Sequence, residues 1–220
     1  MYKTLLFDFD GTLVPSLELW LQAFQYALAQ YDRELPEQTI IDRFYYREYV
    51  DICAEFDLPS GPDLREHVHD GLTIAFTKAE LYDGVRAVLL TARAGGLRVG
   101  LVTTSPRMQV MVVLNRLGVS DLFDTIVTGD DVVNFKPHPE PVLLALANLG
   151  ETADGTLFIG DYIFDVVAGR AAGARTALFL PTAHARFYNL DKLLATSPDF
   201  VFDSYPKLGE LIAPAPALLA

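Results

Sequence analysis

Residues 5–12 have the sequence LLFDFDGT, in which an apolar run leads directly into two aspartates and a glycine. An apolar run of this kind is typical of a buried β-strand, so Asp8 and Asp10 come where that strand ends. Residues two apart in an extended chain point to the same side, which brings the two carboxylates together. Gly11 permits a sharp turn or a close backbone approach. Taken alone, the pattern fits either a metal or phosphate site or a solvated turn.

The composition is that of a globular protein. The chain has 220 residues, of which 51% are apolar and 11% aromatic, enough for one main domain with a sizeable insertion. No apolar run reaches the roughly 18 residues that a membrane-spanning helix needs, and the early Asp8 argues against a signal peptide. Cys53 is the single cysteine, so no internal disulfide forms. A reduced, cytoplasmic location is expected.

The net charge is strongly negative, with 17 Lys and Arg against 29 Asp and Glu, or −12 in total. This balance predicts no binding to nucleic acid and none to an anionic membrane. A small anionic substrate is still compatible, because a metal ion can dominate the local field. Both a monomer and a homodimer fit the sequence.

From residue 81 onward, strand-like and helix-like stretches alternate. Strands are expected over residues 97–102, 123–127, 156–159, 176–180 and 200–202, and helices over 85–94, 108–117, 139–149 and 164–172. Such alternation predicts an α/β fold, a Rossmann-like parallel sheet with helices on both faces.

Residues 16–80 lack this alternation and are predicted to form an inserted, all-α domain. Helices are expected over residues 17–31, 37–46, 49–56 and 64–79. The predicted domains are therefore an α/β core of residues 1–15 and 81–220 and a helical insert of residues 16–80. Two prolines in the small-residue tail, 213–220, predict a frayed end.

Polar residues follow the later apolar strands as well. Thr103, Thr104 and Ser105 follow the second strand, where hydroxyls and free amides suit an anionic oxygen. Ser105 precedes Pro106, so we expect Ser105 to cap the next helix and Thr103 to face the site.

A lysine and two further acidic residues complete the group of polar residues that follow the predicted strands. Lys136 lies in a stiff, proline-rich loop and is either aimed inward or an ordinary surface lysine. Asp161 ends another apolar strand, and Asp165 follows in the first turn of a helix, where a carboxylate is also favourable without any function. Ligands bind outside the carboxyl ends of the strands of an open parallel sheet. Carboxylates beside a lysine and a hydroxyl there predict Mg²⁺ next to a phosphoryl group.

In this order, the motifs resemble those of the haloacid dehalogenase-like hydrolase superfamily. They are residues 8–12, Thr103, Lys136, and Asp161 with Asp165, and the likeness covers nearly the whole chain. Residues 128–132 and 136–141 are most similar to the phosphoglycolate phosphatase-like group. Residues 16–80 correspond to the helical cap of that group.

The resemblance implies a mechanism. Asp8 is the expected nucleophile, forming an aspartyl-phosphate, and Asp10 the expected acid and base. Thr103 and Lys136 would stabilise the charge on the transferring group. The leading function is a Mg²⁺-dependent phosphatase for a small phosphorylated metabolite.

The same resemblance assigns the metal ligands. Mg²⁺ would be held by Asp8, the Asp10 carbonyl and Asp161. Asp165 would either ligate the metal or, more in keeping with its place, orient a bound water or Lys136.

Two features of the sequence reduce the number of reactions that the resemblance allows. Dehalogenase members lack the second acid at the position of Asp10, which favours phosphoryl transfer. Members that cleave phosphonates use a cap lysine, and the only lysine of the insert is Lys78, near its exit. A phosphomutase, and a non-catalytic metabolite-binding protein on the same fold, stay as alternatives.

The insert offers candidates for substrate recognition. Arg43 and Arg47, beside Tyr45 and Tyr46, could bind a second anionic or sugar-like group, with Thr104 as a further substrate-binding residue. Equally, the tyrosines could pack inside the insert under the arginines.

Overall fold

The computed structural model describes residues 2–59 and 61–212. The chain divides into two compact units, Met1–Val14 with Leu81–Ala220, and Pro15–Glu80. We call them the sheet unit and the helical unit. That the helical unit acts as a cap stays a prediction, and the tail 213–220 lies outside the described residues.

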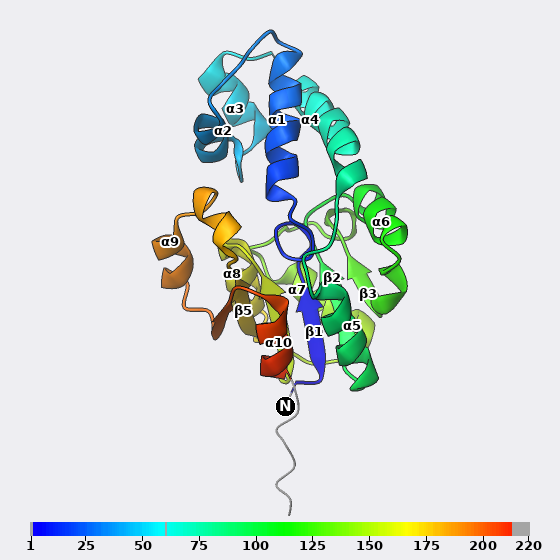
Figure 1. The fold of residues 1–220 in the computed structure, drawn as a ribbon. Coiled ribbons are helices and arrows are strands. Elements are labelled where there is room, and N and C mark those ends of the chain that lie inside the picture. The colour runs from blue at the N-terminus through cyan, green and yellow to red at the C-terminus, as the bar shows by residue number, and fades with distance from the viewer. Residues whose placement is uncertain (1, 60, 213–220) are drawn as a thin grey trace, which may run out of the picture. The chain divides into compact units, whose positions relative to one another are not determined.

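One parallel sheet forms the centre of the sheet unit (Figure 1). Its strands are β1 (Thr4–Phe7), β2 (Arg98–Val102), β3 (Thr125–Val127), β4 (Thr156–Gly160), β5 (Arg175–Phe179) and β6 (Phe200–Phe202). They lie in the order β3-β2-β1-β4-β5-β6, and every neighbouring pair is parallel. This is the strand order of a Rossmann fold, so the predicted α/β class is confirmed.

The burial of the strands explains why the apolar runs predicted them. Every residue of β1 and β4 is buried, as expected for central strands covered on both faces. The edge strands β3 and β6 have three residues each and are partly exposed. The strand order reverses at β1, which has β2 on one side and β4 on the other. The carboxyl ends of β1 and β4 therefore border the crevice where such sheets bind ligands.

Helices cover both faces of the sheet. The α-helices of the described part of this unit are α5 (Val85–Ala94), α6 (Arg107–Arg116), α7 (Glu140–Leu149), α8 (Ile163–Ala171), α9 (Leu190–Ala195) and α10 (Tyr205–Ile212). Side chains of α7 and α8 share a buried cluster with Leu6 of β1 and Phe158 of β4. Helices α5 and α10 pack against each other and cover the face turned to the viewer in Figure 1. Helices α9 and α10 were not among the predicted elements.

The helical unit consists of α-helices that pack against one another. They are α1 (Leu17–Ala29), α2 (Glu37–Phe44), α3 (Tyr49–Phe56) and α4 (Gly61–Ala75), the last followed by the short 3-10 helix η1 (Phe76–Lys78). The backbones of α1 and α4 approach so closely that a Cβ on Gly71 would lie 2.8 Å from Ala23 Cα. Phe24 and Phe44 meet edge to face in the core. Among the described helices, none combines the length and hydropathy that crossing a membrane requires.

Candidate active site

Strand β1 ends just before Asp8, which therefore lies at the carboxyl ends of the strands. A tight loop follows Asp8. The Asp8 amide donates to the Ile159 carbonyl at 2.8 Å, which extends the pairing of β1 with β4 by one residue. Gly11 then adopts a φ of +68° and donates to the Val14 carbonyl at 2.9 Å. A Cβ on Gly11 would lie 1.9 Å from Asp161 Oδ2, so only glycine fits there without displacing that carboxylate.

Lys136 lies at the centre of the site. Its Nζ donates to Asp8 Oδ1 and Asp165 Oδ1 at 2.6 Å each, and to the Val102 carbonyl at 3.2 Å. The side chain is 5% exposed. The sequence left open whether Lys136 points inward or lies on the surface, and the structure has it pointing inward. Lys136 thereby joins Asp8 after β1, the last residue of β2, and Asp165 in α8.

Strand β4 and helix α8 supply the remaining two acids. Asp161 follows β4, and its Oδ2 accepts a 2.5 Å hydrogen bond from the Tyr188 hydroxyl. Its Oδ1 accepts a longer one, 3.4 Å, from the Thr12 hydroxyl. Asp165 lies in the first turn of α8, where its Oδ2 accepts from the Tyr162 amide at 3.0 Å. Asp165 thus has both roles considered for it, as a helix-start acid and as a partner of Lys136.

Burial dominates the electrostatics of these side chains. It raises the pKa of Asp8 to about 7, even though the Lys136 charge opposes the shift, and the charges of Asp165 and Asp10 add to it. Burial, together with the charges of Asp165 and Asp8, also raises the pKa of Asp161 well above its usual range. Burial alone would lower the pKa of Lys136, but the charges of Asp165 and Asp8 raise it instead. If all three were ionised, the carboxylates of Asp8, Asp161 and Asp165 would carry more negative charge than the single ammonium of Lys136 compensates.

A divalent cation fits this charge and this set of donors. Carboxylate oxygens of Asp8, Asp161 and Asp165 lie within 4.8 Å of one another, and all three residues are buried. We call these three residues the acid cluster. Hard divalent cations prefer such oxygen ligands, and two positive charges would balance what one ammonium does not.

One of the hydroxyl residues after β2, Ser105, contacts Asp10. Ser105 Oγ donates to Asp10 Oδ2 at 2.5 Å, and the Ser105 amide donates to Thr103 Oγ1 at 3.1 Å. The expectation that Ser105 caps the next helix was wrong, because its hydroxyl binds Asp10 and the N-cap residue of α6 is Pro106. Thr103 is buried and Thr104 exposed. Asp10 and Thr103 are thus joined through Ser105.

The arginines of the helical unit pair with an acid of the same unit. Arg43 and Arg47 both contact the carboxylate of Glu55, Arg47 at 2.5 Å. The Tyr45 hydroxyl donates to the Leu17 carbonyl, which is the packing role considered for it. Tyr46 is 45% exposed. Substrate binding by Arg43, Arg47 and Thr104 stays a prediction.

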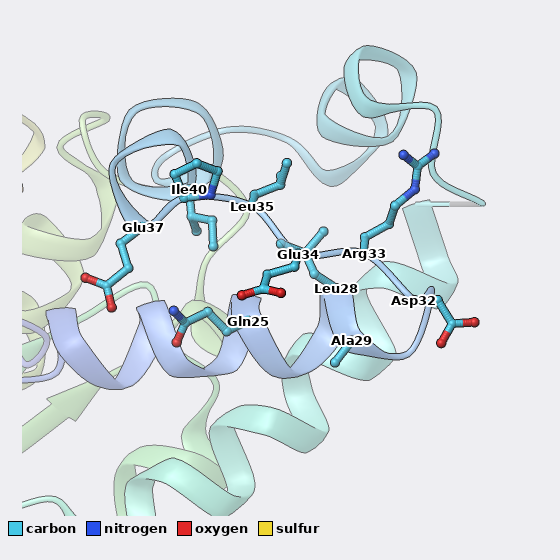
Figure 2. A pocket seen from close by; sticks show the side chains of 10 residues that line it. Gln25, Leu28, Ala29, Asp32, Arg33, Glu34, Leu35, Glu37 and Ile40 are labelled. Carbon is cyan, nitrogen blue, oxygen red and sulfur yellow. The ribbon is translucent and has the colours of Figure 1, made fainter.

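The helical unit also contains a cavity of about 700 Å³, seen in Figure 2. It lies between the second half of α1 and the segment that leads into α2. Leu28 and Ile40 form apolar walls, and the polar Gln25, Glu34 and Glu37 lie around them. None of the residues predicted to bind or react with substrate lines it.

Sequence reasoning missed two residues beside Asp161. Tyr188, through its hydroxyl, and His184, whose Nδ1 lies 3.9 Å from Asp161 Oδ2, come from the segment after β5. Burial lowers the pKa of His184 to about 4. No spacing in this segment marks either residue, because their partner lies more than twenty positions earlier in the chain.

Comparison with known proteins agrees with the geometry. The haloacid dehalogenase-like hydrolase family model matches residues 5–179. The pyrophosphatase PpaX of Bacillus pumilus (strain SAFR-032) is 35% identical over 179 residues, which are 80% of this chain and 82% of that protein. PpaX of Bacillus cereus (strain AH820) is 32% identical over 213 residues, 94% of each chain.

A solved structure gives the same fold. A predicted phosphoglycolate phosphatase from Haemophilus somnus 129PT superposes with a TM-score of 0.80 at 23% identity, covering 96% of this chain and 98% of that one. The family match extends over both the acid cluster and Lys136. The chain therefore belongs to the haloacid dehalogenase-like hydrolase family, as one of its phosphatases.

Proposed function

We propose that this protein hydrolyses a small phosphorylated compound with Mg²⁺ through an aspartyl-phosphate on Asp8. The observation that supports this most is the double contact of Lys136 with Asp8 and Asp165, next to Asp161. A surface role for these residues needs no such burial. A chain that only bound a metabolite would not need a nucleophile, an acid and a counter-charge together.

The first half of the reaction forms the covalent intermediate. A carboxylate oxygen of Asp8 attacks phosphorus, the new O–P bond forms, and the bond to the leaving oxygen breaks. Asp10 donates a proton to that oxygen, so the product leaves as a neutral hydroxyl group. Lys136 and the Thr103 hydroxyl stabilise the charge on the transferring oxygens.

The second half restores the enzyme. Asp10, now ionised, takes a proton from a water molecule that attacks the phosphorus, and the bond to Asp8 breaks as phosphate is released. The bond from Ser105 to Asp10 Oδ2 holds this carboxylate in place for both proton transfers. Asp8, Asp161 and the Asp10 carbonyl would hold Mg²⁺, which supplies positive charge to the phosphoryl oxygens.

Inorganic pyrophosphate is a specific candidate substrate. The two PpaX relatives are named pyrophosphatases and are 35% and 32% identical to this chain. A small phosphomonoester, such as a phosphorylated two-carbon or sugar acid, is the other candidate, suggested by residues 128–132 and 136–141. Both contain a phosphoryl group that the same residues would attack.

Phosphate release tests the proposal directly. We expect the wild type to release phosphate from pyrophosphate or from a member of a phosphomonoester panel when Mg²⁺ is present, and not with EDTA. Asp8→Asn should reduce release to background, and Asp10→Asn by about 10²- to 10⁴-fold. Asp203→Asn is the matched control, since Asp203 pairs with Lys207 on the surface. Release by Asp8→Asn at the wild-type rate would contradict the covalent mechanism.

The phosphomutase alternative gives a different product. A mutase returns the phosphoryl group to the substrate, so a sugar phosphate would be converted to its isomer with little free phosphate. ³¹P NMR of the reaction mixture separates the two outcomes. We expect inorganic phosphate as the final product.

A further inference from the structure

A group of aromatic residues beside the acid cluster contacts it from outside the motifs. Tyr82, Phe179, His184, Tyr188 and Tyr205 lie in the sheet unit, and we call them the aromatic frame. Their rings meet mostly edge to face: Phe179 contacts Tyr82 and Tyr205 at 5.0 and 5.1 Å, and His184 contacts Tyr188 at 5.4 Å. Edge-to-face contacts of this kind hold rings in defined orientations.

The frame is attached to the loop that carries Asp10 and Gly11. The Tyr205 hydroxyl donates to the Thr12 carbonyl at 2.7 Å, and the Tyr82 amide donates to the Leu13 carbonyl at 2.9 Å. The loop and the frame therefore form one connected structure around the end of β1. Asp161 lies against it, since its Oδ2 occupies the place where a Cβ on Gly11 would be.

Tyr188 reaches Asp161 from this frame. It is 7% exposed, and its hydroxyl donates to Asp161 Oδ2 at 2.5 Å. A hydrogen bond from a hydroxyl to a carboxylate is short and strong when it is buried. With Oδ2 held in this way, Asp161 cannot rotate freely about its last torsion.

His184 adds a second polar atom to the same oxygen. It is 2% exposed, and its Nε2 lies 2.7 Å from the Tyr82 hydroxyl. Its Nδ1 is buried, has no hydrogen-bond partner among the described residues, and lies 3.9 Å from Asp161 Oδ2. Buried polar atoms are nearly always paired. If Tyr82 donates to Nε2, the proton of the neutral ring is on Nδ1, and a carboxylate shift of about 1 Å would complete the bond.

We propose that Tyr188 and His184 are positioning residues, which hold the Asp161 carboxylate in the orientation in which it binds the divalent cation. This inference rests on the proposed function, because it assumes that Asp161 is a metal ligand. Groups that hydrogen-bond to a metal ligand fix its orientation, and their loss commonly weakens metal binding by about 10- to 100-fold. Neither residue needs to touch the substrate for this role.

The test compares Mg²⁺ binding by calorimetry with the Mg²⁺ dependence of phosphate release. Tyr188→Phe keeps the ring and removes the hydroxyl. We expect it to raise the Mg²⁺ dissociation constant by about 10-fold or more. The Mg²⁺ concentration for half-maximal activity should rise equally, while kcat at saturating Mg²⁺ stays near wild type. A purely structural role would lower the folded fraction without this separation.

Tyr31→Phe is the matched control, because the Tyr31 hydroxyl is buried in the helical unit without a hydrogen-bond partner among the described residues. It should leave the Mg²⁺ dissociation constant unchanged. His184→Asn keeps an N–H group near the place of Nδ1 and should bind Mg²⁺ more tightly than His184→Phe. If Tyr188→Phe does not fold, the difference in Mg²⁺ binding between His184→Asn and His184→Phe tests the positioning role instead.

The outcomes separate this inference from the proposed function. A wild type that binds Mg²⁺ and releases phosphate, with Tyr188→Phe and His184→Phe binding Mg²⁺ equally well, would overturn the positioning role alone. A wild type that neither binds Mg²⁺ nor requires it would overturn the metal-dependent function, and the positioning role with it. Coupling is a further check: in Asp161→Asn, the added Tyr188→Phe change should have little effect on Mg²⁺ binding.

Discussion

At the scale of single residues, Lys136 is the buried cation that contacts two members of the acid cluster. Its ammonium is 2.6 Å from carboxylates of both Asp8 and Asp165, and all three side chains are nearly inaccessible. Removing one member of a buried ion pair leaves the other charge uncompensated. Without Lys136, a bound metal ion would have to compensate the charge of the acid cluster.

We therefore predict that Lys136→Met lowers the free energy of unfolding by about 3–5 kcal/mol in EDTA and abolishes phosphate release. Urea denaturation measures the first effect. Mg²⁺ should restore part of the stability, because it compensates the same carboxylates, but not the activity. Lys207→Met is the control, since its pair with Asp203 is exposed, and it should behave as wild type. A Lys136→Met protein with wild-type stability in EDTA would show that the ion pairs contribute no net stability.

Gly11 shows how the backbone sets the position of a carboxylate. Alanine there would need a positive φ and would also place a Cβ 1.9 Å from Asp161 Oδ2. We predict that Gly11→Ala loses phosphate release and weakens Mg²⁺ binding, because Asp161 must move. Gly96 has a φ of +78° with nothing near its Cβ position. Gly96→Ala should cost about 1–2 kcal/mol of stability from the backbone alone and leave kcat unchanged.

At the scale of elements, the approach of α1 and α4 is set by one glycine. A Cβ on Gly71 would meet the backbone of Ala23, which cannot move aside as a side chain does. Gly209 of α10 is also inside a helix, but its Cβ would meet only Val88 Cγ2, at 3.9 Å. Substitution by alanine should therefore lower the stability at Gly71 and raise it at Gly209.

We predict that Gly71→Ala destabilises the helical unit by about 1–3 kcal/mol through overpacking. Gly209→Ala should instead stabilise the sheet unit by about 0.5–1 kcal/mol, as alanine usually does in a helix. Trp20, the single tryptophan, lies in α1 and reports the unfolding of the helical unit by fluorescence. An unchanged Trp20 transition in Gly71→Ala would mean that α1 and α4 can separate at little cost.

Elements were predictable where the hydrophobic pattern was long enough. The fully buried β1 and β4 contain the continuous apolar runs of residues 5–7 and 157–159, and α3 and α5 have the predicted bounds. Helix α10 does bury Tyr205, Leu208 and Ile212 at helical spacing, but over only eight residues such a pattern is weak evidence. Helix α4 begins at Gly61, three residues before the predicted start. The proline at its second position is typical of a first helical turn.

The site was predictable where residues follow strands. Asp8 and Asp161 lie together because the parallel strands β1 and β4 end at the same side of the sheet. Tyr188 and His184 were not predictable, since they come from an irregular segment after β5 and reach Asp161 only through the tertiary fold. Ser105 was assigned to the wrong partner, because a local helix cap and a bond to Asp10 look the same in sequence.

At the scale of the whole molecule, the buried acids link folding, metal binding and pH. Burial raises the pKa of Asp8 to about 7 and that of Asp161 well above its usual range, so the native state holds these protons more tightly than the unfolded chain. In EDTA, the contribution of Asp8 to stability is present at low pH and is lost as pH rises through about 7, and the raised pKa of Asp161 acts in the same direction. His184 acts in the opposite direction: burial lowers its pKa to about 4, so its contribution is lost as pH falls from about 6.5 to 4.

A divalent cation must displace the protons on Asp8 and Asp161 to bind, so we predict that Mg²⁺ raises Tm more at pH 8 than at pH 5.5. Comparing Tm with and without Mg²⁺ at each pH largely cancels the contribution of His184. Below pH 7, the apparent Mg²⁺ affinity should fall by up to about 10-fold per pH unit for each proton released. Calorimetry in buffers of different ionisation enthalpy counts those protons. The Asp161→Asn variant should lose most of the Mg²⁺-induced rise in Tm at both pH values. If Mg²⁺ raised the Tm of the wild type equally at pH 5.5 and pH 8, Mg²⁺ would bind away from the acid cluster.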